Sequence, residues 1–188
     1  MNELRAFLER LVKLLDQAGV PFMVAGSFAS AAHGLPRTTQ DLDVVIDPPS
    51  AAALDLLVAS MSSDAYYVDA MTARDALRHR SMFNVVDFAS GWKVDFIVRK
   101  NRAFSREEFS RRMSITLLDV PVFVASAEDT VVAKLEWSRL SGGSERQRRD
   151  VAGIIATVGD DLDREYVARW VAELGLGDEW NAAQRTPL

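Results

Sequence analysis

Apolar side chains recur every three or four residues between Leu4 and Leu15, which predicts an amphipathic helix that ends near Gly19. The apolar run Phe22–Ala25 predicts a short strand, and the small residues of Phe28–His33 predict a short helix. Gly26–Ser27 stands between them and predicts a tight turn. The N-terminal part of the chain is therefore expected to run helix, strand, turn and helix.

Alternating apolar and polar positions continue through the middle of the chain, with Pro36 as a break and Asp47–Pro49 as a second stop signal. Lys93–Val98 and the run before it are separated by a short Gly-containing turn, which predicts a hairpin. The predicted elements are a strand at Leu42–Ile46, a helix with Leu54, Leu57, Val58 and Met61 on its apolar face, a short helix near Thr72–Arg80, strands at Phe83–Phe88 and Lys93–Val98, and an edge strand or bent pair of strands at Thr116–Val124.

The C-terminal third has a helical pattern. Ser126 and Asp129 fit a capping box, and the helix they begin is broken at Ser141–Gly143. Further helices are predicted at about Glu145–Thr157 and Asp163–Leu174. We therefore predict an α+β protein: a mixed sheet flanked by helices and followed by a helical part, forming a single domain over residues 1–188. Its core covers about 1–124, its helical part about 125–176 and a loose tail 177–188.

The composition limits which side chains can catalyse a reaction or bind a metal. The 188 residues include no cysteine and two histidines, which excludes thiolate chemistry and disfavours an imidazole metal site. The net charge of −5 argues against nonspecific DNA binding, and without a long apolar run a cytoplasmic protein with no membrane partner is expected. The segment Arg99–Arg149 nevertheless holds eleven Lys/Arg against seven Asp/Glu, which suits a polyanionic substrate held at one place.

Three acidic residues interrupt otherwise apolar strands. Asp41 and Asp43 are two residues apart, so the pleat of a strand sends both carboxylates to the same face, and Asp95 interrupts a later strand. Three such carboxylates are suited to hold one or two Mg²⁺ ions, or Mn²⁺ in their place. Two acids on an exposed edge strand are also common without any function, but here the Gly26–Ser27 turn upstream offers backbone N–H groups and a hydroxyl to phosphate oxygens.

This combination resembles the polymerase-beta-like nucleotidyltransferase superfamily over Pro21–Ile97. Two later segments, Ala125–Arg139 and Arg148–Val151, are similar to motifs of its small stand-alone members, including the AbiEii-like toxins of bacterial toxin-antitoxin systems. The segments that carry the resemblance are Val24-Ala25-Gly26-Ser27, then Arg37-Thr38-Thr39-Gln40-Asp41-Leu42-Asp43-Val44-Val45, then Lys93-Val94-Asp95-Phe96-Ile97.

The resemblance implies a role for each matching residue. Besides binding metal, Asp95 would help to deprotonate the attacking hydroxyl. Asp150 would orient Lys134 or Arg139, or merely balance the neighbouring arginines. Three of the predicted phosphate contacts also have an interpretation without function. Arg37 would then be a solvated loop arginine, Lys93 a partner of Asp95, and Lys134 a solvated helical lysine. The expected catalytic and metal-binding residues are Asp41, Asp43 and Asp95, and the expected nucleotide-binding residues are Gly26, Ser27, Arg37, Lys93, Lys134 and Asp150.

The function that follows is transfer of a nucleotidyl group from an NTP such as ATP to a hydroxyl, with magnesium as cofactor. The sequence leaves the acceptor open among tRNA, a protein and a small molecule such as a drug, and a cognate antitoxin is a further candidate partner. Two other classes remain as alternatives: a non-catalytic nucleotide- or partner-binding module on the same fold, and a metal-dependent phosphohydrolase, which the Gly26–Ser27 turn disfavours.

Overall fold

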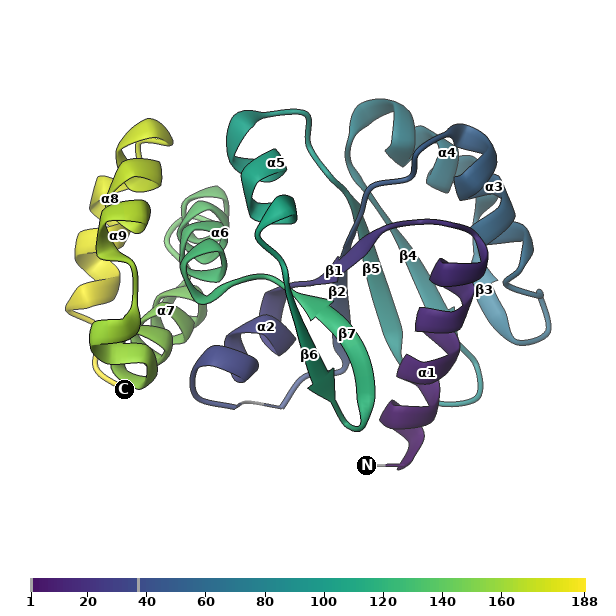
Figure 1. Ribbon diagram of the computed structural model, residues 1–188, viewed down its shortest axis with the longest axis horizontal. Coiled ribbons are helices and arrows are strands. Elements are labelled where there is room, and N and C mark those ends of the chain that lie inside the picture. Colours follow the sequence, from purple (N-terminus) through teal and green to yellow (C-terminus); the bar gives the residue numbers. More distant parts are fainter. Residues whose placement is uncertain (1, 37) are drawn as a thin grey trace. The chain divides into compact units, whose positions relative to one another are not determined.

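A computed structural model describes residues 2–36 and 38–188 of the chain (Figure 1). The chain forms two compact units. The first, here called the sheet unit, consists of Met1–Val24 and Thr39–Val124, and the second, the helical unit, consists of Ala25–Thr38 and Ala125–Leu188. The helical unit thus takes in one segment from the N-terminal half of the chain. That the chain acts as a single domain stays a prediction.

Within the described residues, the sheet unit contains a mixed seven-stranded sheet with the strand order β3-β4-β5-β2-β1-β7-β6 (Figure 1). The central strands β2 and β5 run parallel, whereas β1–β2, β3–β4, β4–β5 and β6–β7 are antiparallel pairs. The α+β fold class is thereby confirmed. The strands are β1 (Phe22–Val24), β2 (Asp41–Ile46), β3 (Tyr66–Val68), β4 (Met82–Asp87), β5 (Lys93–Val98), β6 (Met113–Leu117) and β7 (Val120–Val124).

One face of the central strands forms the core of the sheet unit. Leu42, Val44, Val94 and Phe96 are fully buried, and Phe96 packs against Phe83 with 5.2 Å between the ring centroids. The residues that alternate with them in β2 and β5 point to the opposite, less buried face. The period-two pattern of the sequence therefore separates an apolar face from a polar one.

Helices of the sheet unit complete this core. Helix α1 buries the predicted stripe that includes Leu8, Leu11 and Leu15, and α4 contacts strands β4 and β5. Helix α3 packs against both α1 and α4 and begins at a Ser50 cap, whose hydroxyl accepts a hydrogen bond from the Ala53 amide. The helices are α1 (Asn2–Gln17), α3 (Ala51–Ala59), α4 (Ala70–His79) and α5 (Ala103–Ser110).

The predicted hairpin is present, and a second one forms further along the chain. β4 and β5 pair in register, and Asp87 at the end of β4 accepts hydrogen bonds from the amide and hydroxyl of Ser90 in the connecting turn. The segment predicted as an edge strand or a bent pair is a pair, β6 and β7, joined at Leu118 and Asp119. Both of these turn residues have positive φ, 51° and 62°, as a type I′ turn requires.

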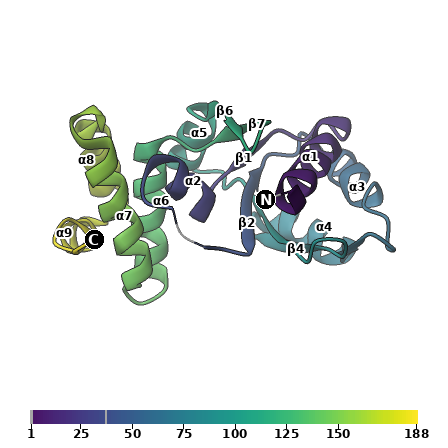
Figure 2. The same cartoon turned by 90° about the horizontal axis from the view of Figure 1, so that it is seen from below.

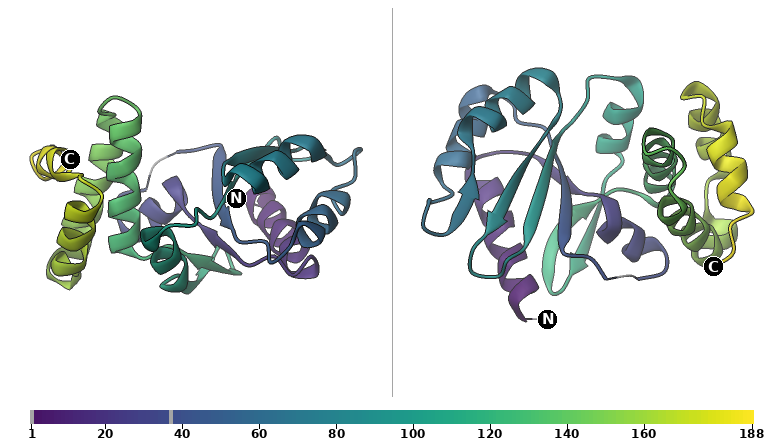
Figure 3. Two further views of the ribbon diagram at one scale, coloured as in Figure 1. Left: turned by 90° about the horizontal axis from the view of Figure 1, so that it is seen from above. Right: turned by 180° about the vertical axis from the view of Figure 1, so that it is seen from behind.

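The helical unit contains α2, α6, α7, α8 and α9, whose course is clearest in Figures 2 and 3. Helix α6 packs against α2, α7, α8 and α9, so it is central to this unit. The Ser126 cap of α6 is confirmed, because the Ser126 hydroxyl accepts from the Asp129 amide. The helices are α2 (Gly26–His33), α6 (Ala127–Leu140), α7 (Glu145–Val158), α8 (Arg164–Glu173) and α9 (Gly177–Gln184), with a short 3-10 turn at Gly159–Asp161.

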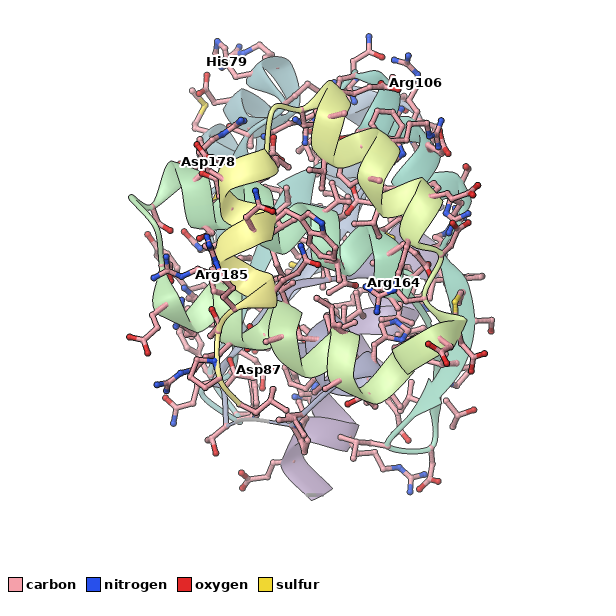
Figure 4. All side chains as sticks on the ribbon, turned by 90° about the vertical axis from the view of Figure 1, so that its left-hand side faces the viewer. His79, Asp87, Arg106, Arg164, Asp178 and Arg185 are labelled. Atoms are coloured by element: carbon pink, nitrogen blue, oxygen red, sulfur yellow. The ribbon has the colours of Figure 1, made fainter. Side chains whose placement is uncertain are left out.

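The loose C-terminal tail is a wrong prediction, because Gly177–Gln184 forms helix α9. Asp178 lies in its first turn and Arg185 at its C-terminal cap, at opposite ends of the helix in Figure 4, where each charge complements the helix dipole. Ala183 is fully buried, so contacts with α6, α7 and α8 stabilise this helix rather than a periodic sequence pattern. The short strand β3 and helix α5 were not predicted either. In the described part of the chain, no helix has the length and apolar character to cross a membrane.

Candidate functional site

The sheet unit brings four of the predicted site residues together on adjacent parallel strands. In the register of β2 and β5, Asp41 is the partner of Lys93 and Asp43 is the partner of Asp95. Partner residues on neighbouring strands lie about 4.8 Å apart, and their side chains leave the same side of the sheet. We call the surface formed by Asp41, Asp43, Lys93 and Asp95 the acidic face; its strands β2 and β5 lie side by side in Figures 1 and 3.

Burial on the opposite side makes this arrangement rigid. Leu42 and Val94 are fully buried between the acidic positions of their strands, so neither strand can slip by one residue without exposing its apolar set and burying carboxylates. The side chain of Asp95 is 13% exposed and that of Asp41 56% exposed. The acidic face thus has a partly enclosed end at Asp95 and an open end at Asp41.

Lys93 supplies positive charge within the acidic face. Its Nζ lies 3.5 Å from Asp41 Oδ1 and 3.3 Å from Asp95 Oδ1. Partial burial opposes the charged form of Lys93, but Asp95 and Asp41 outweigh it and raise the pKa of the ammonium above its ordinary value. Lys93 is therefore protonated at neutral pH and pairs with the carboxylates. This agrees with the alternative prediction that Lys93 is a partner of Asp95.

Asn84 is a member of this site that the sequence did not reveal. It is the register partner of Asp95 across the antiparallel pair β4–β5, and its amide Nδ2 donates a hydrogen bond to Asp95 Oδ1. The only signal in the sequence was a polar residue inside an apolar strand, which is too common to single out. With Asn84 and Lys93 both on Oδ1, one oxygen of Asp95 is fixed by its neighbours.

The donor set of the acidic face fits a hard divalent cation, because Asp43 and Asp95 are adjacent carboxylates and Asp41 lies two residues before Asp43 on the same face. In the part of the chain that the structure describes, however, no three His, Cys, Asp or Glu side chains are gathered closely enough to hold a metal ion. The carboxylates share a face, and the ammonium of Lys93 pairs with two of them. Magnesium binding stays a prediction.

Gly26 and Ser27 begin helix α2, directly after β1 in the chain and as part of the helical unit. Gly26 has a φ of 58°, a conformation that a residue with a side chain rarely adopts, so glycine is required for this abrupt change from strand to helix. The Ala25 cap makes no side-chain hydrogen bond to the helix, and the Ser30 hydroxyl donates to the Gly26 carbonyl. Ser27 is buried, at 4% exposure.

Lys134 and Asp150 also meet within the helical unit. Lys134 Nζ of α6 donates to Asp150 Oδ2 of α7 over 2.7 Å, and both side chains are less than one-tenth exposed, 6% and 8%. Asp150 therefore pairs with Lys134 rather than merely balancing the arginines before it. Lys134 is not the solvated helical lysine of the alternative interpretation.

The predicted residues thus fall into two groups, the acidic face in the sheet unit and Gly26, Ser27, Lys134 and Asp150 in the helical unit. Arg37, the remaining predicted nucleotide-binding residue, lies outside the described residues.

Comparison by sequence finds no matching family model and no matching curated protein. Comparison by structure finds several nucleotidyltransferases. The solution structure of the antibiotic-resistance factor ANT(2'')-Ia is similar with a TM-score of 0.59 and 11% identity, over 97% of this chain and 99% of that chain. An antigenic nucleotidyltransferase-like protein from Paracoccidioides brasiliensis has a TM-score of 0.56 and 15% identity, over 100% of this chain and 94% of that one.

A lincosamide antibiotic adenylyltransferase, LnuA, in its lincomycin-bound crystal structure, is similar with a TM-score of 0.54 and 11% identity, over 80% of this chain and 95% of that chain. Identities this low show the fold and leave the activity to be argued from the site. The chain has a nucleotidyltransferase-like fold: a mixed sheet with flanking helices and a helical C-terminal part.

Proposed function

We propose that this protein is a divalent-metal-dependent nucleotidyltransferase that moves a nucleotidyl group from an NTP to a hydroxyl acceptor. The observation that carries the proposal is the register of β2 and β5, which sets Asp43 beside Asp95 with Asp41 on the same face, within a fold that nucleotidyltransferases share. A sheet does not need two adjacent carboxylates for its stability, because like charges directly opposite each other are destabilising. A cation-dependent function accounts for them.

In the proposed reaction, the acceptor oxygen attacks the α-phosphorus of the NTP, the bond from that phosphorus to the bridging oxygen breaks, and pyrophosphate leaves with the electron pair. Asp41, Asp43 and Asp95 would hold the divalent cation, which supplies charge neutralisation for the leaving pyrophosphate. Asp95, held on one oxygen by Asn84, would accept the proton of the acceptor hydroxyl. Gly26, Ser27, Lys134 and Asp150 stay predicted contacts or supports for the nucleotide.

For the acceptor, we favour a small hydroxylated molecule. ANT(2'')-Ia has also been solved in complex with adenylyl-2''-tobramycin, and the similarity covers 90% of this chain and 97% of that chain. In the basic segment Arg99–Arg149, which suggested a polyanionic partner, some of the arginines are engaged locally. Arg99 pairs with Asp47 and Arg149 with Glu145. Arg139 donates to the carbonyls of the two residues that follow α8, Leu174 and Gly175. A tRNA acceptor, a toxin role and an antitoxin partner therefore have less support.

The test is transfer from each of the four α-labelled NTPs in the presence of Mg²⁺, with aminoglycosides, lincosamides and a tRNA pool offered separately. Asp43→Asn and Asp95→Asn should lower transfer by about 100-fold or more, whereas Asp64→Asn, a change at an exposed aspartate, should leave it unchanged. Labelled antibiotic supports the small-molecule proposal, and labelled tRNA replaces that acceptor. A wild-type protein that binds no NTP would overturn the enzymatic proposal and favour a non-catalytic module.

A further inference from the structure

Lys93 occupies an unusual position for a surface lysine. Its ammonium contacts two carboxylates of the acidic face at once, Asp41 at the exposed end and Asp95 at the enclosed end. Its own side chain is 37% exposed, and four flexible carbons connect the charge to the strand. The ammonium is therefore held by the acids but retains a route to solvent.

The same carboxylates are those proposed to hold the divalent cation. Asp95 Oδ1 already accepts a hydrogen bond from Asn84. Lys93 Nζ lies 3.3 Å from this oxygen and 3.5 Å from Asp41 Oδ1. A divalent cation held by Asp41 and Asp95 would repel the ammonium, and both cations draw on the charge of the same two carboxylates. Binding of one must weaken binding of the other, because two ligands that compete for one site are coupled reciprocally.

We propose that Lys93 is the exchangeable counter-ion of the acidic face: it neutralises Asp41 and Asp95 while no divalent cation is bound, and the cation displaces it. The inference rests on the proposed function for the identity of the cation. The displaced ammonium is then available to the negatively charged triphosphate that arrives with the metal. Asn84, which is neutral, keeps its hydrogen bond to Asp95 in both states and positions that carboxylate throughout.

The structure explains why such a counter-ion is needed. Asp41, Asp43 and Asp95 place three carboxylates on one face of two strands, and like charges in register destabilise a sheet. With Lys93 beside Asp41 and Asp95, the metal-free protein keeps part of this charge neutralised.

The first test measures binding of Mn²⁺ to the full-length protein without nucleotide, by electron paramagnetic resonance, in the wild type, Lys93→Met, Lys93→Arg and Lys13→Met. Lys93→Met should bind Mn²⁺ on the order of tenfold more tightly than the wild type. Its metal-free melting temperature should fall, and Mn²⁺ should raise it by more than in the wild type. Lys93→Arg should stay close to the wild type. Lys13→Met removes the same charge from an exposed position on α1 and should change neither quantity.

The second test follows the lysine itself in the wild type and needs no variant. An amine-reactive reagent, with the products quantified by mass spectrometry, should modify Lys93 several-fold faster when Mg²⁺ is present, while the exposed Lys13 and Lys100 react at constant rates. Equal or weaker Mn²⁺ binding by Lys93→Met, or a Lys93 that reacts at the same rate with and without Mg²⁺, overturns the exchange. Failure of the proposed function gives a different result: the wild type then shows no Mn²⁺ binding that is lost in Asp43→Asn.

Discussion

Lys134 and Asp150 form a buried ion pair between helices α6 and α7, with Nζ 2.7 Å from Oδ2. An ion pair that is this deeply buried stabilises the fold only while both charges are present, because each alone would face a large desolvation penalty. The pair therefore joins two helices of the helical unit.

Removing one partner of this pair should be costly. Asp150→Ala leaves the Lys134 ammonium buried without its carboxylate, and we expect a loss of about 3–5 kcal/mol in the free energy of unfolding. The double variant Lys134→Met/Asp150→Leu should recover most of that loss. Urea denaturation followed by circular dichroism measures both. If Asp150→Ala and the double variant are equally unstable, the loss does not come from the buried Lys134 charge.

Gly34 lies close to the backbone of helix α7. A Cβ added there would lie 2.9 Å from the Ile154 nitrogen and 3.1 Å from the Gly153 carbonyl carbon. These are backbone atoms of α7 and cannot move aside cheaply, so Gly34→Ala should destabilise the protein by about 1–3 kcal/mol.

Gly153 provides a matched control with the opposite sign. Its added Cβ would meet Leu35 at 3.5 Å, which is ordinary contact, and Gly153 lies inside helix α7. Gly153→Ala should therefore leave stability unchanged or raise it by up to about 1 kcal/mol through helix propensity. Thermal unfolding of both variants measures the difference, and similar losses for both would contradict the close approach at Gly34.

The turn between β6 and β7 should favour glycine over alanine at Asp119. Asp119 has a φ of 62° and is exposed, and its ion pair with Arg5 is a surface contact of little energetic value. Asp119→Gly should raise the free energy of unfolding relative to Asp119→Ala by about 1 kcal/mol, because glycine adopts the left-handed conformation without strain. Chemical denaturation of this pair of variants is the measurement, and equal stabilities would show that the turn does not hold this conformation.

The N-terminal cap of α4 should make stability depend on pH. Hydrogen bonds from Thr72 lower the pKa of Asp69 below its ordinary value of 3.8, first from the Thr72 side chain and then from its backbone amide. The Thr72 amide donates to Asp69 Oδ1 over 2.6 Å. A carboxyl with a lowered folded pKa contributes stability that is fully present above 3.8 and is lost as the pH falls through the folded value.

The difference in urea midpoint between the wild type and Asp69→Asn should therefore shrink as the pH is lowered from 6 to 3. Asparagine still caps the helix but does not titrate, so its variant serves as the reference. A difference that stays constant over this range would show that the Asp69 charge contributes nothing to the cap.

Local patterns in the sequence were sufficient to predict most helices and strands of the protein. They also predicted that two of its acidic residues share one face of a strand. Side-chain period and turn residues act over a few positions, so the strand at Leu42–Ile46, the hairpin before Val98 and the Ser126 cap could all be predicted. The same period put Asp41 and Asp43 on one face without reference to the rest of the chain.

Tertiary structure decided what those residues meet. Strand order in a mixed sheet depends on packing between segments far apart in the chain, so only the structure sets Asp43 beside Asp95, brings Asn84 onto Asp95 and pairs Lys134 with Asp150. It also forms α9 from a segment without helical periodicity, because burial against other helices compensates for the weak local signal. Local geometry is encoded by neighbours in sequence, whereas the pairing of charges is decided by neighbours in space.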